Sequence, residues 1–305
     1  MRIVDKISKL IFNPQIRFGY LSRLGVYNKM PDEEYLCKEW SYHFDKPLDL
    51  QNPQTFNEKL QWLKIHNRIS EYTTMVDKYA VKQYVADKIG EQYVIPLLGV
   101  WNCFKEIDFD KLPNQFVLKC THDSGGGVVI CRDKENFDKK QAEKILSTYL
   151  KRKYYYCHRE WPYKDVKPRI IAEQYMAEKN NKGLTDYKFY CFNGVPLYLY
   201  VSIGLENHAT AQMSFLNIDW SFADFGRTDY KPLEKLPNKP ARFEEMINMV
   251  KRLSKGIPFL RVDLYEINGE IYFGEYTFSP CAGMMPFDPP EADLKLGQLL
   301  DISHV

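Results

Sequence analysis

The sequence of 305 residues lacks several features that would place it in a familiar class. No run is long and apolar enough to span a bilayer, and the first 20 residues have neither the apolar core nor the cleavage site of a secretory signal. No repeat or low-complexity tract is present. Basic and acidic side chains number 42 and 40, for a formal net charge of +2, which predicts no nucleic-acid partner. These absences favour a cytoplasmic globular protein.

Paired cysteines are also missing. Seven cysteines, an odd number, are scattered along the chain without any CxxC pair, so neither a zinc site nor a thioredoxin-type centre is indicated. Free cysteines of this kind are typical of a reducing compartment. Aromatic residues, in contrast, are abundant, with 22 Tyr and 18 Phe. They suit strand-rich cores, and stacking against sugars or bases is the alternative use.

The hydrophobic pattern mixes helices and strands without a regular βαβ alternation, which predicts an α+β fold. Residues 1–75 read mainly as helices separated by polar turns. Short β-rich runs follow, and Asn193-Gly194 and Asn268-Gly269 are strong hairpin signals between later strands. Residues 243–253 carry apolar side chains along one face of a helix.

A glycine-rich loop, Ser124-Gly125-Gly126-Gly127, joins two of the predicted strands. It is not a P-loop, because GxxxxGK[ST] is absent and no helix follows. Bare backbone N–H groups in such a loop can approach phosphate oxygens closely. Lys119, just before the loop, could add a cation. A glycine run is also common in ordinary turns, so the loop alone is a weak signal.

The C-terminal hairpin carries a second set of candidate residues, Arg261, Asp263, Glu275 and Thr277. Mg²⁺ prefers carboxylate oxygens, and two carboxylates share a metal only if they project from one sheet face. A two-residue turn would place Asp263 and Glu275 on opposite faces. We therefore predict a three-residue loop, residues 268–270, or an equivalent bulge that pairs Asp263 with Glu275 and Arg261 with Thr277. The alternative is an exposed strand face with ordinary charges.

The order of these motifs resembles the ATP-grasp superfamily and, more specifically, the TupA-like ATP-grasp family. The likeness extends from about residue 30 to the end and rests on several short motifs. They are Phe56-Asn-Glu-Lys-Leu60, Pro96-Leu-Leu-Gly-Val100, Asp186-Tyr-Lys-Phe189 with Cys191-Phe-Asn-Gly194, and Phe273-Gly-Glu-Tyr-Thr277. Bacteria use proteins of this family in making teichuronopeptide, capsule and other surface polysaccharides.

This resemblance implies two α+β subdomains that grip ATP between them. Residues 1–75 would be a helical N-terminal region, 76–175 the first subdomain with the glycine-rich lid, and 176–305 the second with a Mg²⁺-binding hairpin. The implied phosphate ligands are Lys78, Lys119 and the lid residues Ser124, Gly125, Gly126 and Gly127. In the implied hinge, Glu173 lies near the adenine amino group, the Met176 backbone reads the ring edge, and Glu178 binds the ribose.

The same resemblance assigns the chemistry to five further residues. Lys188 would reach the γ-phosphate or the acyl phosphate, and Arg261 would stabilise charge at the activated carboxylate. Asp263 and Glu275 would bind Mg²⁺. Thr277 completes the metal set, at a position where many ATP-grasp enzymes carry asparagine, which predicts a weaker or water-completed site. The first 70 or so residues lack the superfamily's usual strand–helix pattern.

The implied activity is ATP-dependent ligation of a carboxylate to an amine through an acyl phosphate. The resemblance also suggests a uronic acid or amino acid as the acid, with a sugar or lipid-linked glycan as a possible partner. A grasp-fold kinase is one alternative. A glycosyltransferase is another, supported by Asp108-Phe-Asp110, and a carbohydrate-binding module is a third. Residues 1–24 mix apolar and basic side chains, which favours an amphipathic helix that packs on the protein and also allows peripheral membrane contact.

Overall fold

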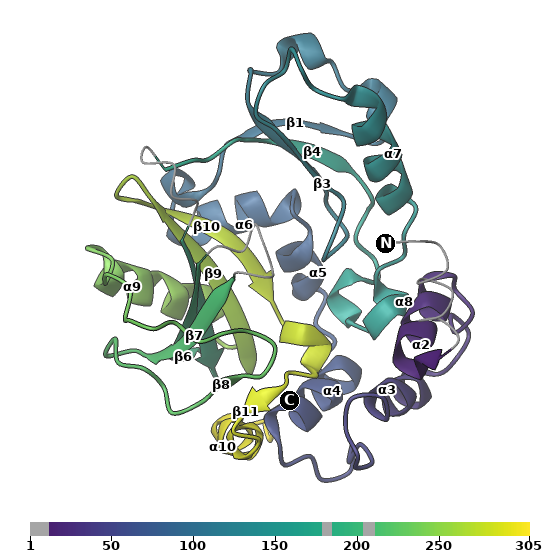
Figure 1. Ribbon diagram of the computed structural model, residues 1–305, viewed down its shortest axis with the longest axis vertical. Coiled ribbons are helices and arrows are strands. Elements are labelled where there is room, and N and C mark those ends of the chain that lie inside the picture. Colours follow the sequence, from purple (N-terminus) through teal and green to yellow (C-terminus); the bar gives the residue numbers. More distant parts are fainter. Residues whose placement is uncertain (1–11, 179–184, 204–210) are drawn as a thin grey trace.

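Two antiparallel sheets form the two halves of the molecule (Figure 1). The computed structural model describes residues 12–178, 185–203 and 211–305. The smaller sheet has the strand order β1-β4-β2-β3. Its strands are β1 (Leu97–Trp101), β2 (Phe116–Cys120), β3 (Val128–Cys131) and β4 (Ile170–Gln174). Helix α7 (Lys139–Leu150) packs on this sheet through the buried Ala142 and Leu146.

The larger sheet has the order β10-β9-β5-β6-β7. Its strands are β5 (Asp186–Phe192), β6 (Val195–Ile203), β7 (Gln212–Asn217), β9 (Phe259–Ile267) and β10 (Glu270–Thr277). A two-stranded sheet pairs β8 (Gly226–Arg227) with β11 (Phe287–Asp288). The mixture of helices with antiparallel sheets confirms the predicted α+β class.

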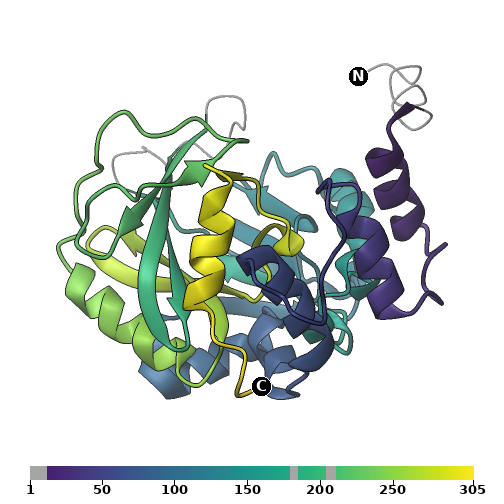
Figure 2. The same ribbon diagram turned by 90° about the horizontal axis from the view of Figure 1, so that it is seen from below.

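Helices cover both faces of the larger sheet. Helices α6 (Ala80–Ile89) and α9 (Phe243–Ser254) share one hydrophobic core with it. Helices α4 (Phe56–His66) and α10 (Glu291–Leu299) share another, and Figure 2 shows these two side by side. Successive side chains of β5 point to opposite faces of the sheet. Phe189 enters the core with α9, whereas Lys188 and Tyr190 point to the other face.

The N-terminal region is helical, as predicted, over the part that the structure describes. It contains α2 (Pro14–Arg23), α3 (Asp32–Trp40), α4 and α5 (Glu71–Val76). Helix α2 projects at the outer edge of the molecule (Figure 2). The short helix α8 (Tyr155–His158) anchors this region, because Tyr35 donates to the Cys157 carbonyl at 2.6 Å and the buried Arg159 pairs with Asp32 at 3.0 Å.

Short 3₁₀ turns complete the chain. They span Glu91–Tyr93, Phe104–Glu106, Phe109–Lys111, Trp161–Tyr163 and Pro280–Gly283. No helix among the described residues is long and apolar enough to cross a membrane. The three-part division at residues 75 and 175 stays a prediction.

The β9–β10 hairpin has the predicted pairing, but through the bulge rather than through the three-residue loop. Asn268 and Gly269 are both left-handed, with φ of 54° and 84°, and form a two-residue turn. The register then shifts between Phe273 and Glu275, so that Asp263 pairs with Glu275 and Arg261 with Thr277. The extra residue is Gly274. A bulge therefore brings the two carboxylates to one face.

Replacement of Gly274 by alanine is expected to destabilise the protein by about 1–3 kcal/mol. The added Cβ would lie 2.9 Å from a ring carbon of Tyr265 and 3.1 Å from the Asp263 carbonyl oxygen. Chemical denaturation measures the change. Gly226→Ala is a matched control, because its Cβ would meet no atom closer than 4.0 Å, and we expect its effect to stay within about 0.5 kcal/mol. Equal stability of the two variants would contradict a close-packed bulge.

Candidate nucleotide and carboxylate-activation site

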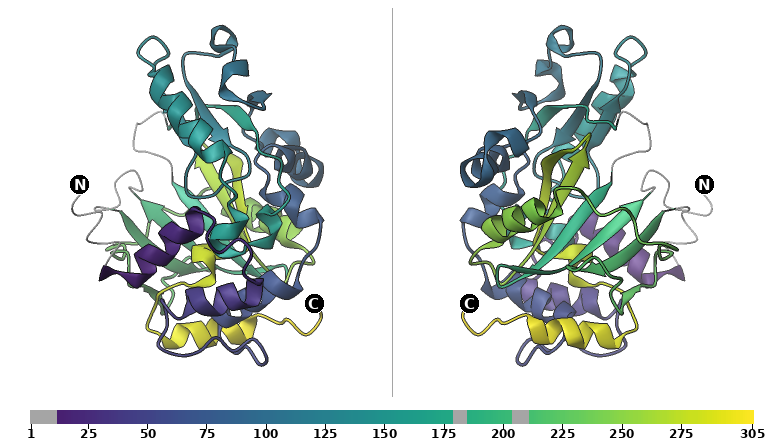
Figure 3. Two further views of the ribbon diagram at one scale, coloured as in Figure 1. Left: turned by 90° about the vertical axis from the view of Figure 1, so that its right-hand side faces the viewer. Right: turned by 90° about the vertical axis from the view of Figure 1, so that its left-hand side faces the viewer.

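A cleft lies between the two sheets, where the β9–β10 hairpin extends toward the smaller sheet (Figure 3). Its lining brings together residues from five elements or loops: Lys78, Lys82 of α6, Lys119 of β2, Glu173 of β4 and Glu275 of β10. The free volume is about 100 Å³, well below the roughly 300–1,000 Å³ of pockets that hold a drug-sized ligand. A ligand of that size would enter only after the lining side chains move.

Two lysines of this cleft share one buried carboxylate. Glu173 accepts from Lys82 at 2.5 Å and from Lys119 at 2.6 Å, one lysine on each oxygen. Burial would raise the pKa of Glu173, but the two ammonium groups outweigh it and hold the pKa below its ordinary value. The cluster thus carries one net positive charge from three groups. Such a surplus suits an anionic ligand.

The glycine-rich loop does not line the cleft itself but begins next to Asp123, which contacts the cleft residue Lys78. Lys78 donates from Nζ to the Asp123 carbonyl, and Cys120 N donates to Gly127 O at 2.9 Å across the base of the loop. Gly125 and Gly127 are left-handed, with φ of 75° and 63°. At Gly126 a Cβ would lie 2.1 Å from the Tyr149 ring. Glycine is therefore required at 125–127 by conformation or by space, and the backbone stays bare.

A second cluster lies on the face of the larger sheet that Lys188 shares with β9. Asp263 is fully buried and accepts from Lys188 at 2.5 Å. Arg261 donates to the same carboxylate from two nitrogens, Nε and Nη2, each at 2.7 Å. Its Nη2 also donates to Glu275 at 2.9 Å, and Asp186 forms an ion pair with Lys188. Five charged side chains therefore converge from three adjacent strands.

The charges of this cluster depend on one another. Burial opposes ionisation of Asp263, yet Arg261 and Lys188 hold its pKa below the ordinary value. Burial also opposes the charge of Lys188, but Asp263 raises the pKa of that ammonium group. For Asp186, burial has the largest effect and raises the pKa of the carboxyl group to about 6. Asp263 is thus the ionised centre that keeps both cations in place.

The structure gathers most of the predicted site residues. Lys78, Lys119, Glu173 and Glu275 line the cleft, and Lys188, Arg261 and Asp263 form the adjoining cluster. Thr277 pairs with Arg261 across the hairpin. Met176 and Glu178 do not line the cleft; the Glu178 carboxylate accepts from Asn268 N at 3.4 Å, beside the hairpin turn. The hinge roles of these residues stay predictions.

Among the cleft residues that sequence reasoning missed are Lys82 and Tyr163. Lys82 had a usable signal, because it follows Lys78 by four residues, a spacing that would put two side chains on one face of a helix. Tyr163 had none. It lies in a 3₁₀ turn far from the other motifs, and only the packing of that turn against α5 brings it to the cleft.

The carboxylates of Asp263 and Glu275 lie on either side of one cationic group. Asp263 and Glu275 both direct an oxygen at one point, where the Arg261 Nη2 lies 2.7 Å and 2.9 Å from them. Carboxylate oxygens are the ligands that Mg²⁺ prefers. Within the described part of the chain, no three His, Cys, Asp or Glu side chains gather around one point. Asp263 and Glu275 therefore fit a cation that takes its other ligands from phosphates and water.

Two α+β subdomains that enclose a cationic cleft, with paired carboxylates on the adjoining hairpin, define an ATP-grasp architecture. The family model for TupA-like ATP-grasp proteins matches residues 58–301. The chain therefore belongs to the TupA-like ATP-grasp family. No curated protein sequence matches it.

Solved structures with a similar fold include ligases of low sequence identity. D-alanine–D-alanine ligase from Helicobacter pylori has 16% identity and a TM-score of 0.48, with 82% of this chain and 70% of that chain covered. The Bacillus anthracis D-alanine–D-alanine ligase complexed with ATP has 16% identity and a TM-score of 0.39, covering 67% and 54%. D-cycloserine synthetase DcsG has 14% identity and a TM-score of 0.41, covering 74% and 69%.

Proposed function

We propose that this protein joins a carboxylate to an amine through an acyl phosphate, with conversion of ATP to ADP and phosphate. The observation that carries the proposal is the adjacency of two clusters. A lysine-rich cleft with a glycine loop suits the phosphates of ATP, and the neighbouring Lys188, Arg261 and Asp263 suit a reacting carboxylate. Glu275 belongs to both clusters, since it lines the cleft and pairs with Arg261.

The two chemical steps follow from these groups. A carboxylate is a poor electrophile, so an oxygen of the acid first attacks the γ-phosphorus and ADP leaves. The amine then attacks the acyl carbon, and the phosphate leaves with the bonding electron pair while the amine loses a proton. Both steps bring anions together or create an oxyanion, so fixed cations lower the barrier. Closure of the glycine loop would keep water from the acyl phosphate.

Each residue has a role in this scheme. Lys78, Lys82 and Lys119 would exchange their present partners, a carbonyl and Glu173, for phosphate oxygens. Lys188 would bind the transferred phosphoryl group. Arg261 would stabilise the oxyanion at the acyl carbon. A Mg²⁺ ion held by Asp263 and Glu275 would neutralise charge on the phosphates. Thr277, opposite Arg261, would supply a further oxygen or hold a water ligand.

The substrates are proposed on family likeness. We expect a uronic acid or an amino acid as the carboxylate and a sugar or a lipid-linked glycan precursor as the larger substrate, in bacterial capsule or surface-polysaccharide synthesis. A cytoplasmic location is part of the same proposal. Peripheral membrane contact is supported by four exposed apolar or aromatic side chains spaced four residues apart: Ile16 and Tyr20 of α2, and Phe12 and Leu24 next to its two ends. The basic residues Lys6 and Lys9 lie outside the described residues. Failure to sediment with anionic vesicles would remove this contact.

Hydroxylamine provides a direct test of the reaction class. It is a small amine that captures acyl phosphates as hydroxamates, so it replaces the unknown amine while a panel of uronic and amino acids is screened. We expect one class of acid to give ADP and hydroxamate in equal amounts, dependent on Mg²⁺. ADP without hydroxamate, together with a phosphorylated hydroxyl, would favour a kinase instead.

Ligand-dependent thermal unfolding separates the remaining alternative. Mg²⁺-ATP is expected to raise the melting temperature in a saturable manner, because a ligand that binds only the folded state stabilises it. A shift with UDP-sugars and none with ATP would overturn the ligase proposal in favour of a glycosyltransferase. In the structure, Asp108 pairs with Lys111 on an exposed turn, so its carboxylate does not line the cleft.

A further inference from the structure

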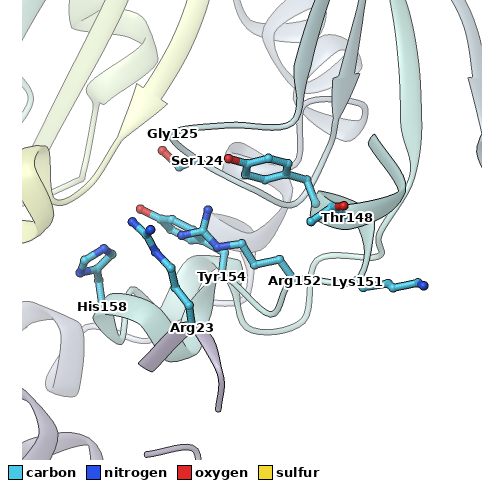
Figure 4. Close-up of a pocket in the computed structure, with 9 residues that line it drawn as sticks. Arg23, Ser124, Gly125, Thr148, Lys151, Arg152, Tyr154 and His158 are labelled. Atoms are coloured by element: carbon cyan, nitrogen blue, oxygen red, sulfur yellow. The ribbon is translucent and has the colours of Figure 1, made fainter. Parts of the chain in front are cut away.

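A second, larger pocket lies on the outer side of the glycine loop (Figure 4). Its volume is about 580 Å³. The walls are Arg23 at the end of α2, Ser124 and Gly125 of the loop, and Arg152, Tyr154 and His158 near α8. In Figure 4 the guanidinium groups of Arg23 and Arg152 point toward one another beside Tyr154, whereas Lys151 extends away from them. The ATP-grasp site described above uses only the loop residues of this pocket.

The charged side chains that line this pocket are basic. None of the described residues that line it carries a carboxylate. Arg23 is exposed and has no ion-pair partner in the described part of the chain. Arg152 pairs from behind with the buried Asp123 at 3.3 Å, and its buried Nε has no hydrogen-bond partner among the described groups. The Nδ1 atom of His158 lies 2.7 Å from the Glu39 carboxylate, which does not line the pocket. Asp123 and Glu39 thus orient Arg152 and His158 without lining the pocket themselves.

The pocket adjoins the nucleotide cleft through Ser124. The Ser124 side chain lies beside the phenols of Tyr154, which lines the pocket, and of Tyr163, which lines the cleft. Tyr154 is buried and Tyr163 is half-buried, both lie near Glu160, and Tyr154 donates to the Glu160 carboxylate at 2.7 Å. The loop that would close over ATP is therefore also a wall of the basic pocket. A substrate bound there is next to the site where the carboxylate is activated.

We propose that this pocket binds the phosphate or diphosphate group of the larger substrate, a phosphorylated sugar derivative. This inference rests on the proposed ligase function. A single carboxylate needs only one cation, whereas Arg23 and Arg152 together match the two or three charges of a phosphate ester or diphosphate, and the His158 ring is a further polar group of the same pocket. Tyr149 and Tyr154, whose rings lie 5.8 Å and 5.3 Å from the Arg152 guanidinium, provide flat surfaces beside it.

Inorganic pyrophosphate is the probe, titrated by calorimetry into the full chain with Mg²⁺ and a saturating non-hydrolysable ATP analogue. The analogue fills the nucleotide cleft, so that pyrophosphate can bind only elsewhere. We expect Arg23→Glu to weaken pyrophosphate binding at least about 10-fold, because it replaces a charge-assisted contact with repulsion. Lys29→Glu makes the same charge change on an exposed residue outside the pocket and is expected to change affinity by less than about 2-fold.

The outcomes separate this inference from the proposed function. No pyrophosphate binding to the wild type, or equal affinities for Arg23→Glu and Lys29→Glu, would overturn the phosphate pocket. Binding of the ATP analogue is measured first. Its failure would overturn the proposed function, while pyrophosphate binding could still be compared between variants. Competition by a nucleoside diphosphate sugar, or by vesicles that carry a polyprenyl diphosphate, would support the pocket and show which source supplies the phosphate.

Discussion

The Glu275→Gln protein is expected to form acyl phosphate about 10²–10³ times more slowly than the wild type and to keep its fold. Glu275 holds one side of the proposed metal position and pairs with Arg261 at 2.9 Å. Its side chain is 45% exposed, so loss of the ion pair costs little stability, about 1 kcal/mol at most. The measurement is the initial rate of hydroxamate formation, with the melting temperature recorded alongside.

Glu270→Gln provides the matched control. Glu270 lies at the start of the same strand, is 67% exposed and pairs with Arg242 at 2.7 Å. Both substitutions therefore remove one charge and one partly exposed ion pair from β10. Only the first removes an oxygen that faces Asp263. If Glu275→Gln kept more than about a tenth of the activity, or if Glu270→Gln lost as much, the metal role of Glu275 would be wrong.

Replacement of Glu173 by glutamine is expected to destabilise the free protein by about 2–4 kcal/mol at pH 7. The substitution leaves Lys82 and Lys119 close together with no carboxylate between them. Urea denaturation measures the loss. Mg²⁺-ATP should reduce it, because phosphates would supply the missing negative charge. An equal loss with and without ATP would contradict the placement of the phosphates against these lysines.

The cost of Glu173→Gln should depend on pH in one direction. The folded-state pKa of Glu173 is held below its ordinary value by the two lysines. Its contribution to stability is therefore fully present above about pH 4.5 and is lost as the pH falls through the folded-state pKa. The stability difference between wild type and variant should shrink between pH 5 and pH 3. A constant difference over this range would contradict an ionised, lysine-paired Glu173.

The hairpin shows how far sequence reasoning reached. The requirement that Asp263 and Glu275 share a face excluded a plain two-residue turn, and the pairing predicted from that requirement is confirmed. The structural feature that produces this pairing was not predicted uniquely. Asn268-Gly269 forms the two-residue turn that its composition favours, and Gly274 supplies the bulge. Glycine does not mark a bulge by itself, so the choice between a longer loop and a bulge could not be made from the sequence.

The partners of the lysines could not be predicted either. Glu173 was expected near the adenine, and the structure puts it between Lys82 and Lys119. Lys119 and Glu173 are neighbours because β2 pairs with β4, which are separated by about 50 residues of sequence. Lys82 belongs to helix α6 and reaches Glu173 from outside the smaller sheet. Charge pairing across such separations depends on strand order and helix placement, which no local pattern encodes.

The sequence by itself determined the family and the pairing of Asp263 with Glu275 and of Arg261 with Thr277. The pairing follows from a short-range rule, the alternation of side chains between the two faces of a strand. Only the tertiary structure decided that Glu173 pairs with two lysines and that Tyr163 reaches the cleft. It also decided that Lys188 lies opposite Asp263, and that Arg23 shares a pocket with Arg152 and His158 beside the glycine loop. Those contacts join residues far apart in the chain, and packing of whole elements brings them together.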